Sequence, residues 1–412
     1  MRRAFLTLAL ASLTLFTVAG SAPLVSQESQ GPPPTPVPPF GSPSPYPTAL
    51  ETPDIPKLKP VLSAPSGAVL DLDSGRMLYA TGGTTRRPIA STTKIMTALL
   101  VLESVGMRDV VTVSPVAAGQ SGASLGLQSG ERIRVRDLLY ALMLQSANDA
   151  AVALAEHVAG SVQEFVGRMN RRARALGLRD TRFRSPNGLD DRGYSTALDL
   201  ARITVRALRD PVLARIARTK FHKVPSPGGS VRRIQNRNAL LWLYPGAFGV
   251  KSGFTSAAGS CLVAAAERDE LRLVSVVLGA PAEAFSDAAT LLDWGFMTFE
   301  LRRVVIAGER FEPVMVDGLE VALEAAGTVK VLVREETVVN RTVELDPRRS
   351  LPLERGQRLG EVVVTSRAGR ELARTPVVSV EDVSPRAGLP WAPRIWEQAT
   401  GFLSAMFRSL LA

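Results

Sequence analysis

The chain has 412 residues, of which 45% are hydrophobic and 21% are charged, and its net charge is +10. This balance is typical of globular proteins and excludes a disordered chain or a multi-span membrane protein. The single cysteine, Cys261, excludes an intramolecular disulfide framework and a cysteine-rich zinc site, and two histidines leave little for a multi-histidine metal centre or a Ser-His-Asp triad. We therefore expect chemistry that uses no metal and no cofactor.

The beginning of the chain has the features of an export signal followed by a spacer. Residues 1–22 are typical of a signal peptide, because Arg2 and Arg3 precede an apolar run and small residues follow it. An uncleaved membrane anchor is the alternative, although the run is short for a membrane span. Residues 23–61 are rich in proline, which predicts an extended, disordered linker.

Strand-like and helix-like patterns are mixed over residues 62–302, which predicts an α/β (α+β) domain. In chain order, the predicted elements are a hairpin over 67–79, a buried helix over 95–105, a helix over 135–158 that breaks near Gln145-Ser146, and strands over 262–266 and 271–278.

Helix signals stop after Leu301. Short β-branched runs separated by turn residues predict a small all-β domain over 303–383, with strands over 329–333, 342–345, 361–365 and 377–380. Residues 384–412 read as a linker and an amphipathic helix, because 391–412 gathers two Trp and two Phe on one face with Arg opposite. Such a helix is typical of a membrane interface, and a helix packed on the protein's own core is the alternative.

Ser91-Thr92-Thr93-Lys94 comes immediately before the first buried helix. At a helix start, backbone N–H groups stabilise negative charge, and the spacing of three brings the Lys94 amine within reach of the Ser91 hydroxyl. A serine needs a base to become a nucleophile, and a buried lysine, unlike arginine, can lose its proton near neutral pH. Taken alone, the motif also fits an N-cap serine followed by an exposed lysine.

A second motif, Ser146-Ala147-Asn148, lies at the predicted helix break. A hydroxyl and an amide two residues apart on a short turn can pass a proton and bind a substrate amide. Taken alone, the same residues also fit an N-cap pair that opens the following helix.

A third motif, Lys251-Ser252-Gly253, precedes a predicted strand and is followed by Thr255. On a strand edge, Lys251 and Ser252 can meet a substrate carboxylate. Gly253 allows close approach of the backbone, and the N–H of Phe254 can donate to an oxyanion. Taken alone, this is an ordinary turn.

In this order and spacing the motifs resemble the S-x-x-K, S-x-N and K-[ST]-G signature of penicillin-recognising active-site serine enzymes. Four flanking stretches are similar to the low-molecular-weight D-alanyl-D-alanine carboxypeptidases of the serine peptidase S11 family: 86–100, 130–160, 183–203 and 236–280. The resemblance covers about 62–383. It implies a β-lactamase/transpeptidase-like catalytic domain, with an antiparallel sheet flanked by helices plus a helical subdomain, then a β-sandwich domain and a C-terminal membrane-anchor helix.

The resemblance also implies a role for each motif residue. Ser91 is expected to be acylated by the penultimate D-Ala of a peptidoglycan stem peptide, with Lys94 as the general base. Ser146 is expected to relay a proton to the leaving amine, and Asn148 to hold Lys94 or the substrate amide. The residues expected to bind substrate are Lys251, Ser252, Gly253, Phe254, Thr255 and Arg237, with an oxyanion hole formed by the N–H groups of Ser91 and Phe254.

Two alternatives share these motifs. One is a β-lactamase or another wall peptidase, for which the sequence offers no convincing extra glutamate base between Ser146 and Lys251. The other is a catalytically weak penicillin-binding scaffold. Four positions, Ala147, Gly193, Phe248 and Ser252, depart from the family's common residues but leave the catalytic groups in place.

The expected partners are the stem peptide, β-lactam antibiotics and the outer face of the cytoplasmic membrane, to which the exported protein would attach peripherally. A net charge of +10 would also be compatible with binding to nucleic acid. The densest basic stretch, 168–184, lacks interleaved stacking aromatics, and export argues against such a partner, so we expect none.

Overall fold

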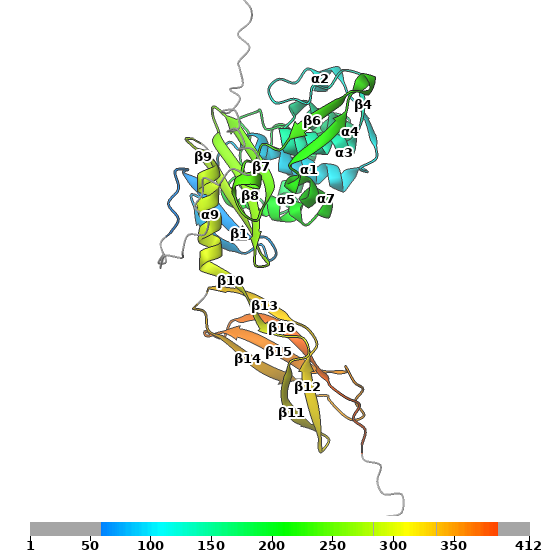
Figure 1. Ribbon diagram of the computed structural model, residues 1–412, viewed down its shortest axis with the longest axis vertical. Helices are drawn as coiled ribbons and strands as arrows, with labels where there is room; N and C mark the ends of the chain where they lie inside the picture. The colour runs from blue at the N-terminus through cyan, green and yellow to red at the C-terminus, as the bar shows by residue number, and fades with distance from the viewer. Residues whose placement is uncertain (1–58, 283, 335, 386–412) are drawn as a thin grey trace, which may run out of the picture.

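The structure is a computed structural model that describes residues 59–282, 284–334 and 336–385. Two bodies lie end to end along the long axis of the molecule (Figure 1). The first body contains strands β1–β9 and the helices, and the second contains strands β10–β16. The expected signal peptide, most of the expected linker and the expected C-terminal amphipathic helix lie outside the described residues.

An antiparallel five-stranded sheet in the order β2-β1-β9-β8-β7 forms the centre of the first body. Strands β1, β8 and β9 are buried along most of their length, so their sequences are almost continuously apolar. The strands are β1 (Ser66–Asp71), β2 (Met77–Thr81), β7 (Ala247–Thr255), β8 (Gly259–Arg268) and β9 (Leu271–Ala280). The predicted hairpin and the two predicted strands are therefore confirmed.

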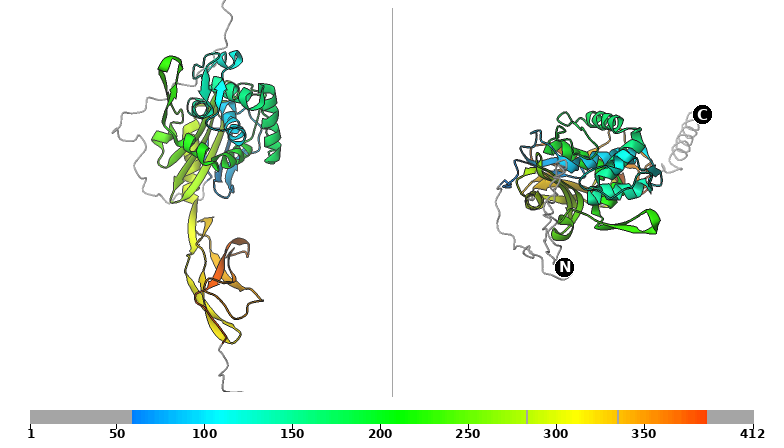
Figure 2. Two further views of the ribbon diagram at one scale, coloured as in Figure 1. Left: turned by 90° about the vertical axis from the view of Figure 1, so that its right-hand side faces the viewer. Right: turned by 90° about the horizontal axis from the view of Figure 1, so that it is seen from above.

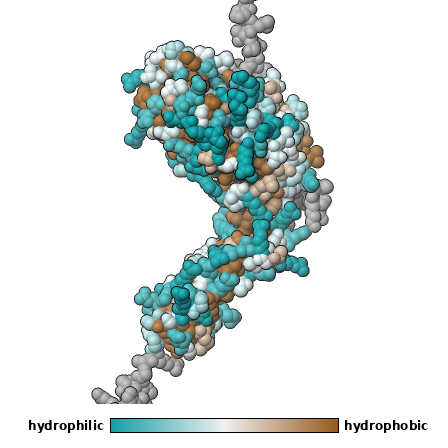
Figure 3. All heavy atoms as spheres, turned by 180° about the vertical axis from the view of Figure 1, so that it is seen from behind, coloured by the Kyte–Doolittle hydropathy of each residue, from teal (hydrophilic) through white to brown (hydrophobic). Residues whose placement is uncertain are grey.

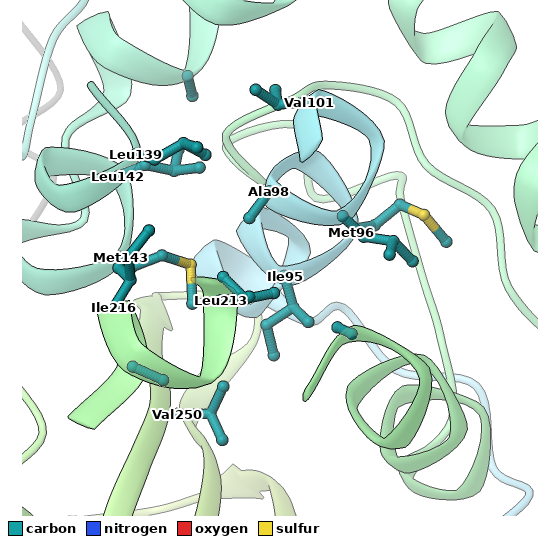
Figure 4. Close-up of a cluster of buried hydrophobic side chains, with 14 of the residues drawn as sticks. Ile95, Met96, Ala98, Val101, Leu139, Leu142, Met143, Leu213, Ile216 and Val250 are labelled. Atoms are coloured by element: carbon teal, nitrogen blue, oxygen red, sulfur yellow. The ribbon is translucent and has the colours of Figure 1, made fainter. Parts of the chain in front are cut away.

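Helices cover both faces of this sheet. Alternate residues of the strands pack against α9 (Ala284–Thr298) on one face and against α6 (Ala197–Leu208) and α7 (Pro211–Arg218) on the other. The central helix α1 (Lys94–Ser104) has apolar residues around most of its circumference, so it is buried between neighbours. Figure 4 shows Ile95, Met96, Ala98 and Val101 of α1 among side chains from α7, β7 and the segment 139–143.

A helical subdomain and two short two-stranded sheets complete the first body. The predicted helix break is confirmed: α3 (Val135–Tyr140) continues into a π-helical turn, η2 (Ala141–Gln145), and α4 (Asn148–Ala159) begins after it. The other elements are α2 (Pro115–Ala118), α5 (Val162–Ala175), α8 (Leu240–Leu243), the 3-10 turns η1 (Ala90–Thr93) and η3 (Pro227–Gly229), and the paired strands β3 (Val110–Thr112) with β4 (Arg132–Arg134) and β5 (Phe221–Pro225) with β6 (Val231–Gln235).

The second body consists of two packed sheets, in the orders β11-β12-β16-β15-β14 and β10-β13, with a core of valines and leucines. The prediction that this part of the chain forms strands and no helix is confirmed for the described residues. The structure adds three strands that were not predicted, β10 to β12. The strands are β10 (Phe299–Val305), β11 (Arg310–Val316), β12 (Leu319–Ala325), β13 (Val329–Arg334), β14 (Val339–Leu345), β15 (Arg358–Ser366) and β16 (Glu371–Ser379).

The two bodies touch through side chains of the first hairpin and the start of β10. The guanidinium group of Arg76 lies 5.8 Å from the centre of the Phe299 ring, and Glu270, in the turn between β8 and β9, forms an ion pair of 2.7 Å with Lys330 of β13. Arg76 also donates a hydrogen bond of 2.9 Å to the carbonyl of Leu332. The left view of Figure 2 shows the same end-to-end arrangement from the side, and hydrophilic side chains cover much of the rear face of both bodies (Figure 3). Within the described residues, we find no helix with the length and apolar character needed to cross a membrane.

Candidate active site

Ser91 lies in the 3-10 turn η1, one turn before the helix that carries Lys94. The preceding residue, Ala90, has a φ of 43°, a left-handed conformation that L-residues rarely adopt. Such strain is maintained only where surrounding structure fixes the backbone, and it is common at functional sites. The turn packs against strand β7, which brings two distant parts of the chain to one place.

Lys94 is the centre of the site. Its side chain is fully buried, and its amine Nζ lies 2.8 Å from Oγ of Ser91, 2.7 Å from Oδ1 of Asn148 and 2.8 Å from the carbonyl oxygen of Asn187. The two amide oxygens can only accept hydrogen bonds. A neutral amine that donates to both of them therefore directs its lone pair toward the Ser91 hydroxyl, as a general base requires.

The second motif is placed by the π-helical turn. Ser146 follows η2 with a φ of 64°, and both Ser146 and Asn148 are buried. The Asn148 side chain is held from both sides, because Nδ2 donates to the carbonyl of Ser121 at 2.8 Å while Oδ1 faces Lys94. The predicted convergence of the first two motifs is thus present in the fold.

Strand β7 carries the third motif past Ser91. A Cβ atom added at Gly253 would lie 2.8 Å from the backbone N of Ser91 and 3.0 Å from that of Thr92, so only glycine permits this approach. Ser252, Gly253 and Phe254 are half-buried along the strand. The backbone N–H groups of residues 91 and 254 thus belong to two segments in direct contact.

Lys251 is buried to 1% exposure and donates a hydrogen bond of 2.6 Å to the carbonyl of Ser252. Burial holds the pKa of Lys251 well below its usual value, and the neighbouring basic groups of Lys94 and Arg237 lower this pKa further. Arg237 is positioned by its backbone N–H, which donates to the carbonyl of Leu144 in η2. Three basic side chains therefore converge on one small volume, as is typical of a site that receives an anion.

The Thr255 hydroxyl is engaged within the protein. It donates to Oδ1 of Asp191 at 2.7 Å and accepts a hydrogen bond from the N–H of Ala258. Thr255 therefore ties the end of β7 to the loop that contains Asn187 and Gly188.

That loop supplies two residues that sequence reasoning missed. Asn187 contributes its backbone carbonyl to Lys94, a role that residue type does not reveal. Gly188 has a φ of 86°, and a Cβ atom there would overlap the carbonyl oxygen of Ala90. The Pro-Asn-Gly sequence is a turn signal that could have marked this close approach.

Comparisons with known proteins found a matching family model and several similar proteins. A family model described as D-alanyl-D-alanine carboxypeptidase, peptidase S11, matches residues 55–282. The D-alanyl-D-alanine carboxypeptidase DacF of Bacillus subtilis is 31% identical over 353 residues, covering 82% of this chain and 90% of the relative. The enzyme of the same description, DacC, of Escherichia coli is 32% identical and covers 82% of this chain and 88% of the relative. The crystal structure of penicillin binding protein 5 from Haemophilus influenzae has a TM-score of 0.61 at 32% identity and covers 80% of this chain and 99% of that one.

Proposed function

Because the chain belongs to the peptidase S11 family of D-alanyl-D-alanine carboxypeptidases and is a serine carboxypeptidase, we propose that Ser91 is its nucleophile and Lys94 its general base. The observation that supports these roles is the 2.8 Å distance between Nζ of Lys94 and Oγ of Ser91 inside a buried shell of amide oxygens. The substrate class is the peptidoglycan stem peptide that ends in D-Ala-D-Ala.

In the acylation step, Oγ of Ser91 attacks the carbonyl carbon of the penultimate D-Ala while Lys94 takes the hydroxyl proton. The bond to the nitrogen of the terminal D-Ala then breaks, and Ser146 relays the proton to this leaving amine. In the second step, water attacks the ester with Lys94 as base, which releases the shortened peptide and restores Ser91. The backbone N–H groups of Ser91 and Phe254 stabilise the oxyanion in both steps.

The terminal carboxylate of the substrate is bound by the basic end of the site. Ser252 donates its hydroxyl, and Lys251 and Arg237 provide positive charge. An arriving carboxylate favours the protonated form of Lys251, because it supplies the opposite charge that this buried amine lacks in the free protein. Gly253 contributes by its lack of a side chain, and Thr255 by holding the end of the strand.

A β-lactam undergoes the same attack at its lactam carbonyl. Because the amine that leaves remains tethered to the acyl group, it stays in the position that water needs, and the ester on Ser91 persists. Covalent labelling by penicillin is therefore part of the proposal.

Lys94→Arg is the test of the base. Arginine keeps the charge but cannot lose its proton, so labelling of Ser91 by fluorescent penicillin and release of D-Ala from diacetyl-Lys-D-Ala-D-Ala should both fall at least about 1000-fold. Lys223→Arg, on the exposed face of β5, is the matched control and should behave as the parent protein. Full activity of Lys94→Arg would remove Lys94 as the base.

The remaining proposals concern the domain bounds and the location of the protein. We propose that residues 62–302 form the catalytic domain and 303–383 the β-sandwich domain, although β10 continues across this division from Phe299 to Val305. We also propose that the protein is exported and that the amphipathic pattern of 391–412 attaches it to the outer face of the cytoplasmic membrane.

A further inference from the structure

A second buried polar group lies directly behind the candidate active site. Asp149 follows Asn148 in the first turn of α4, and its side chain is fully buried. Its carboxylate accepts a hydrogen bond of 2.6 Å from the Ser124 hydroxyl and hydrogen bonds of 3.0 Å from the N–H groups of three consecutive residues, Leu125, Gly126 and Leu127. Within the described parts of the chain, no cation pairs with it. One segment therefore supplies most of the donors that compensate this buried charge.

The same segment touches the active site with its other polar groups. The carbonyl of Ser121 accepts from Nδ2 of Asn148 at 2.8 Å, and the carbonyl of Ala123 accepts from the backbone N–H of Asn148 at 2.6 Å. The carbonyl of Ser124 accepts from Nε2 of Gln145, in the π-helical turn before Ser146. Residues 121–127 are thus bonded to Asp149 on one side and to the second motif on the other.

The orientation of the Asn148 amide depends on this segment. Because Nδ2 donates to Ser121, Oδ1 must face Lys94. An amide that turned over would present its N–H to Lys94 and would compete for the lone pair that has to accept the Ser91 proton. Holding Ser121 in place therefore keeps Lys94 able to act as a base.

We propose that Asp149 is a positioning residue for acylation, which acts by fixing residues 121–127 and through them the side-chain amide of Asn148. The proposal rests on the proposed role of Lys94 as the general base. Asp149 is held away from the reacting atoms by this arrangement and takes no part in the proton transfers.

Asp149→Asn is the informative substitution. It conserves shape, but its new NH₂ group faces N–H donors, so part of the loop must release its hydrogen bonds. Because the substrate carboxylate is bound by other residues, we expect kcat for D-Ala release to fall about 10-fold or more while KM changes less than about threefold. The acylation rate with fluorescent penicillin should fall by a similar factor. If Asp149 served stability alone, Asp149→Asn would lower the melting temperature but would not lower kcat at a nearly unchanged KM.

Asp287→Asn is the matched control. Asp287 is also a buried carboxylate that holds a chain segment, because it accepts from the N–H groups of Ser63 and Ala64 and from the Ser63 hydroxyl, but it lies on α9 across the central sheet. Both variants should melt at a lower temperature than the parent, and Asp287→Asn should keep the parent acylation rate. Should Asp149→Asn fail to fold, Ser124→Ala removes one donor only and should slow acylation about twofold to fivefold.

The outcomes are separable when the full-length parent, these variants and Lys94→Arg are measured together. Parent-like acylation in Asp149→Asn, or in Ser124→Ala where that variant replaces it, overturns the positioning role. An equal loss in Asp287→Asn also overturns it, because the effect would then follow stability. An active Lys94→Arg instead overturns the proposed function. An inactive Lys94→Arg beside a parent-like Asp149→Asn leaves the proposed function intact and rejects only the positioning role.

Discussion

Gly253 shows how a missing side chain can determine the geometry of the site. Strand β7 passes so close to Ser91 that a methyl group would meet the backbone nitrogens of Ser91 and Thr92. In Gly253→Ala the strand must move away from η1, which separates the two N–H groups proposed to form the oxyanion hole. We expect acylation by penicillin to slow by about 100-fold or more, since losing one such donor has an effect of that size.

The control for this substitution is Gly167→Ala. Gly167 lies in helix α5, and its added Cβ atom would come no nearer than 3.4 Å to any neighbour. This variant should keep the parent acylation rate and gain about 0.5–1 kcal/mol in the free energy of unfolding, because alanine is the better helix former. Equal acylation rates in the two glycine variants would contradict the steric explanation.

Lys251 illustrates a conflict between stability and function. Its pKa is well below the usual value in the folded protein and returns to the usual value, 10.5, on unfolding. Between these two pKa values the unfolded chain binds more protons than the folded protein. Lys251 therefore destabilises the fold most at low pH, and this destabilisation disappears as the pH rises toward 10.5. Lys251→Met should therefore raise the free energy of unfolding at pH 7 by about 1–3 kcal/mol, while substrate turnover is lost.

The stability gain should shrink steadily in urea titrations between pH 7 and pH 10. Lys223→Met, at an exposed position, is the control and should change stability by less than about 0.5 kcal/mol at each pH. A gain for Lys251→Met that is constant with pH would mean that better packing, not removal of a buried charge, is its cause.

At the level of elements, the buried and strongly patterned segments were the predictable ones. The helix starting at Lys94 and the strands β8 and β9 are almost continuously apolar, so their burial is visible in the sequence. Strands β11 and β12 were missed because only one of their faces packs on the core of the second body, so their apolar runs are short and are interrupted by charged residues and a proline. The break after Gln145 was predictable, but its π-helical form was not, since nothing in residue type selects it.

The candidate site also contains residues that the sequence predicts and residues that it does not. Ser91, Lys94 and Asn148 were predictable as candidates because the order and spacing of the three motifs resemble a known family, and the structure brings them together. The carbonyl of Asn187 was not, because every residue carries a carbonyl and only the fold decides which one faces the amine. Asp149 resembles an ordinary acidic residue in the first turn of a helix, and its hydrogen bonds depend on a loop whose path the sequence does not specify.

At the scale of the whole molecule, the second body separates the active site from the last described residues. Strand β16 ends at Ser379, and the described chain ends at Pro385, on a body that extends away from the first one (Figure 1). A membrane attachment that follows Pro385 would therefore leave the first body at a distance from the lipid surface. This arrangement suits an enzyme whose substrate is a wall polymer outside the membrane.

The proposed membrane attachment can be tested by placing the same new charge on either face of the amphipathic pattern. Trp396→Asp places a carboxylate on the apolar face of the amphipathic pattern in 391–412, and Gln398→Asp places the same charge on the polar face. Since burying a charge among acyl chains is unfavourable, Trp396→Asp should reduce cosedimentation with phosphatidylglycerol vesicles at least about 10-fold, whereas Gln398→Asp should reduce it less than about threefold. Both variants should release D-Ala from the soluble peptide at the parent rate, because the first body is unchanged. A fall in this rate for Trp396→Asp, with vesicle binding retained, would instead indicate that the helix packs on the protein itself.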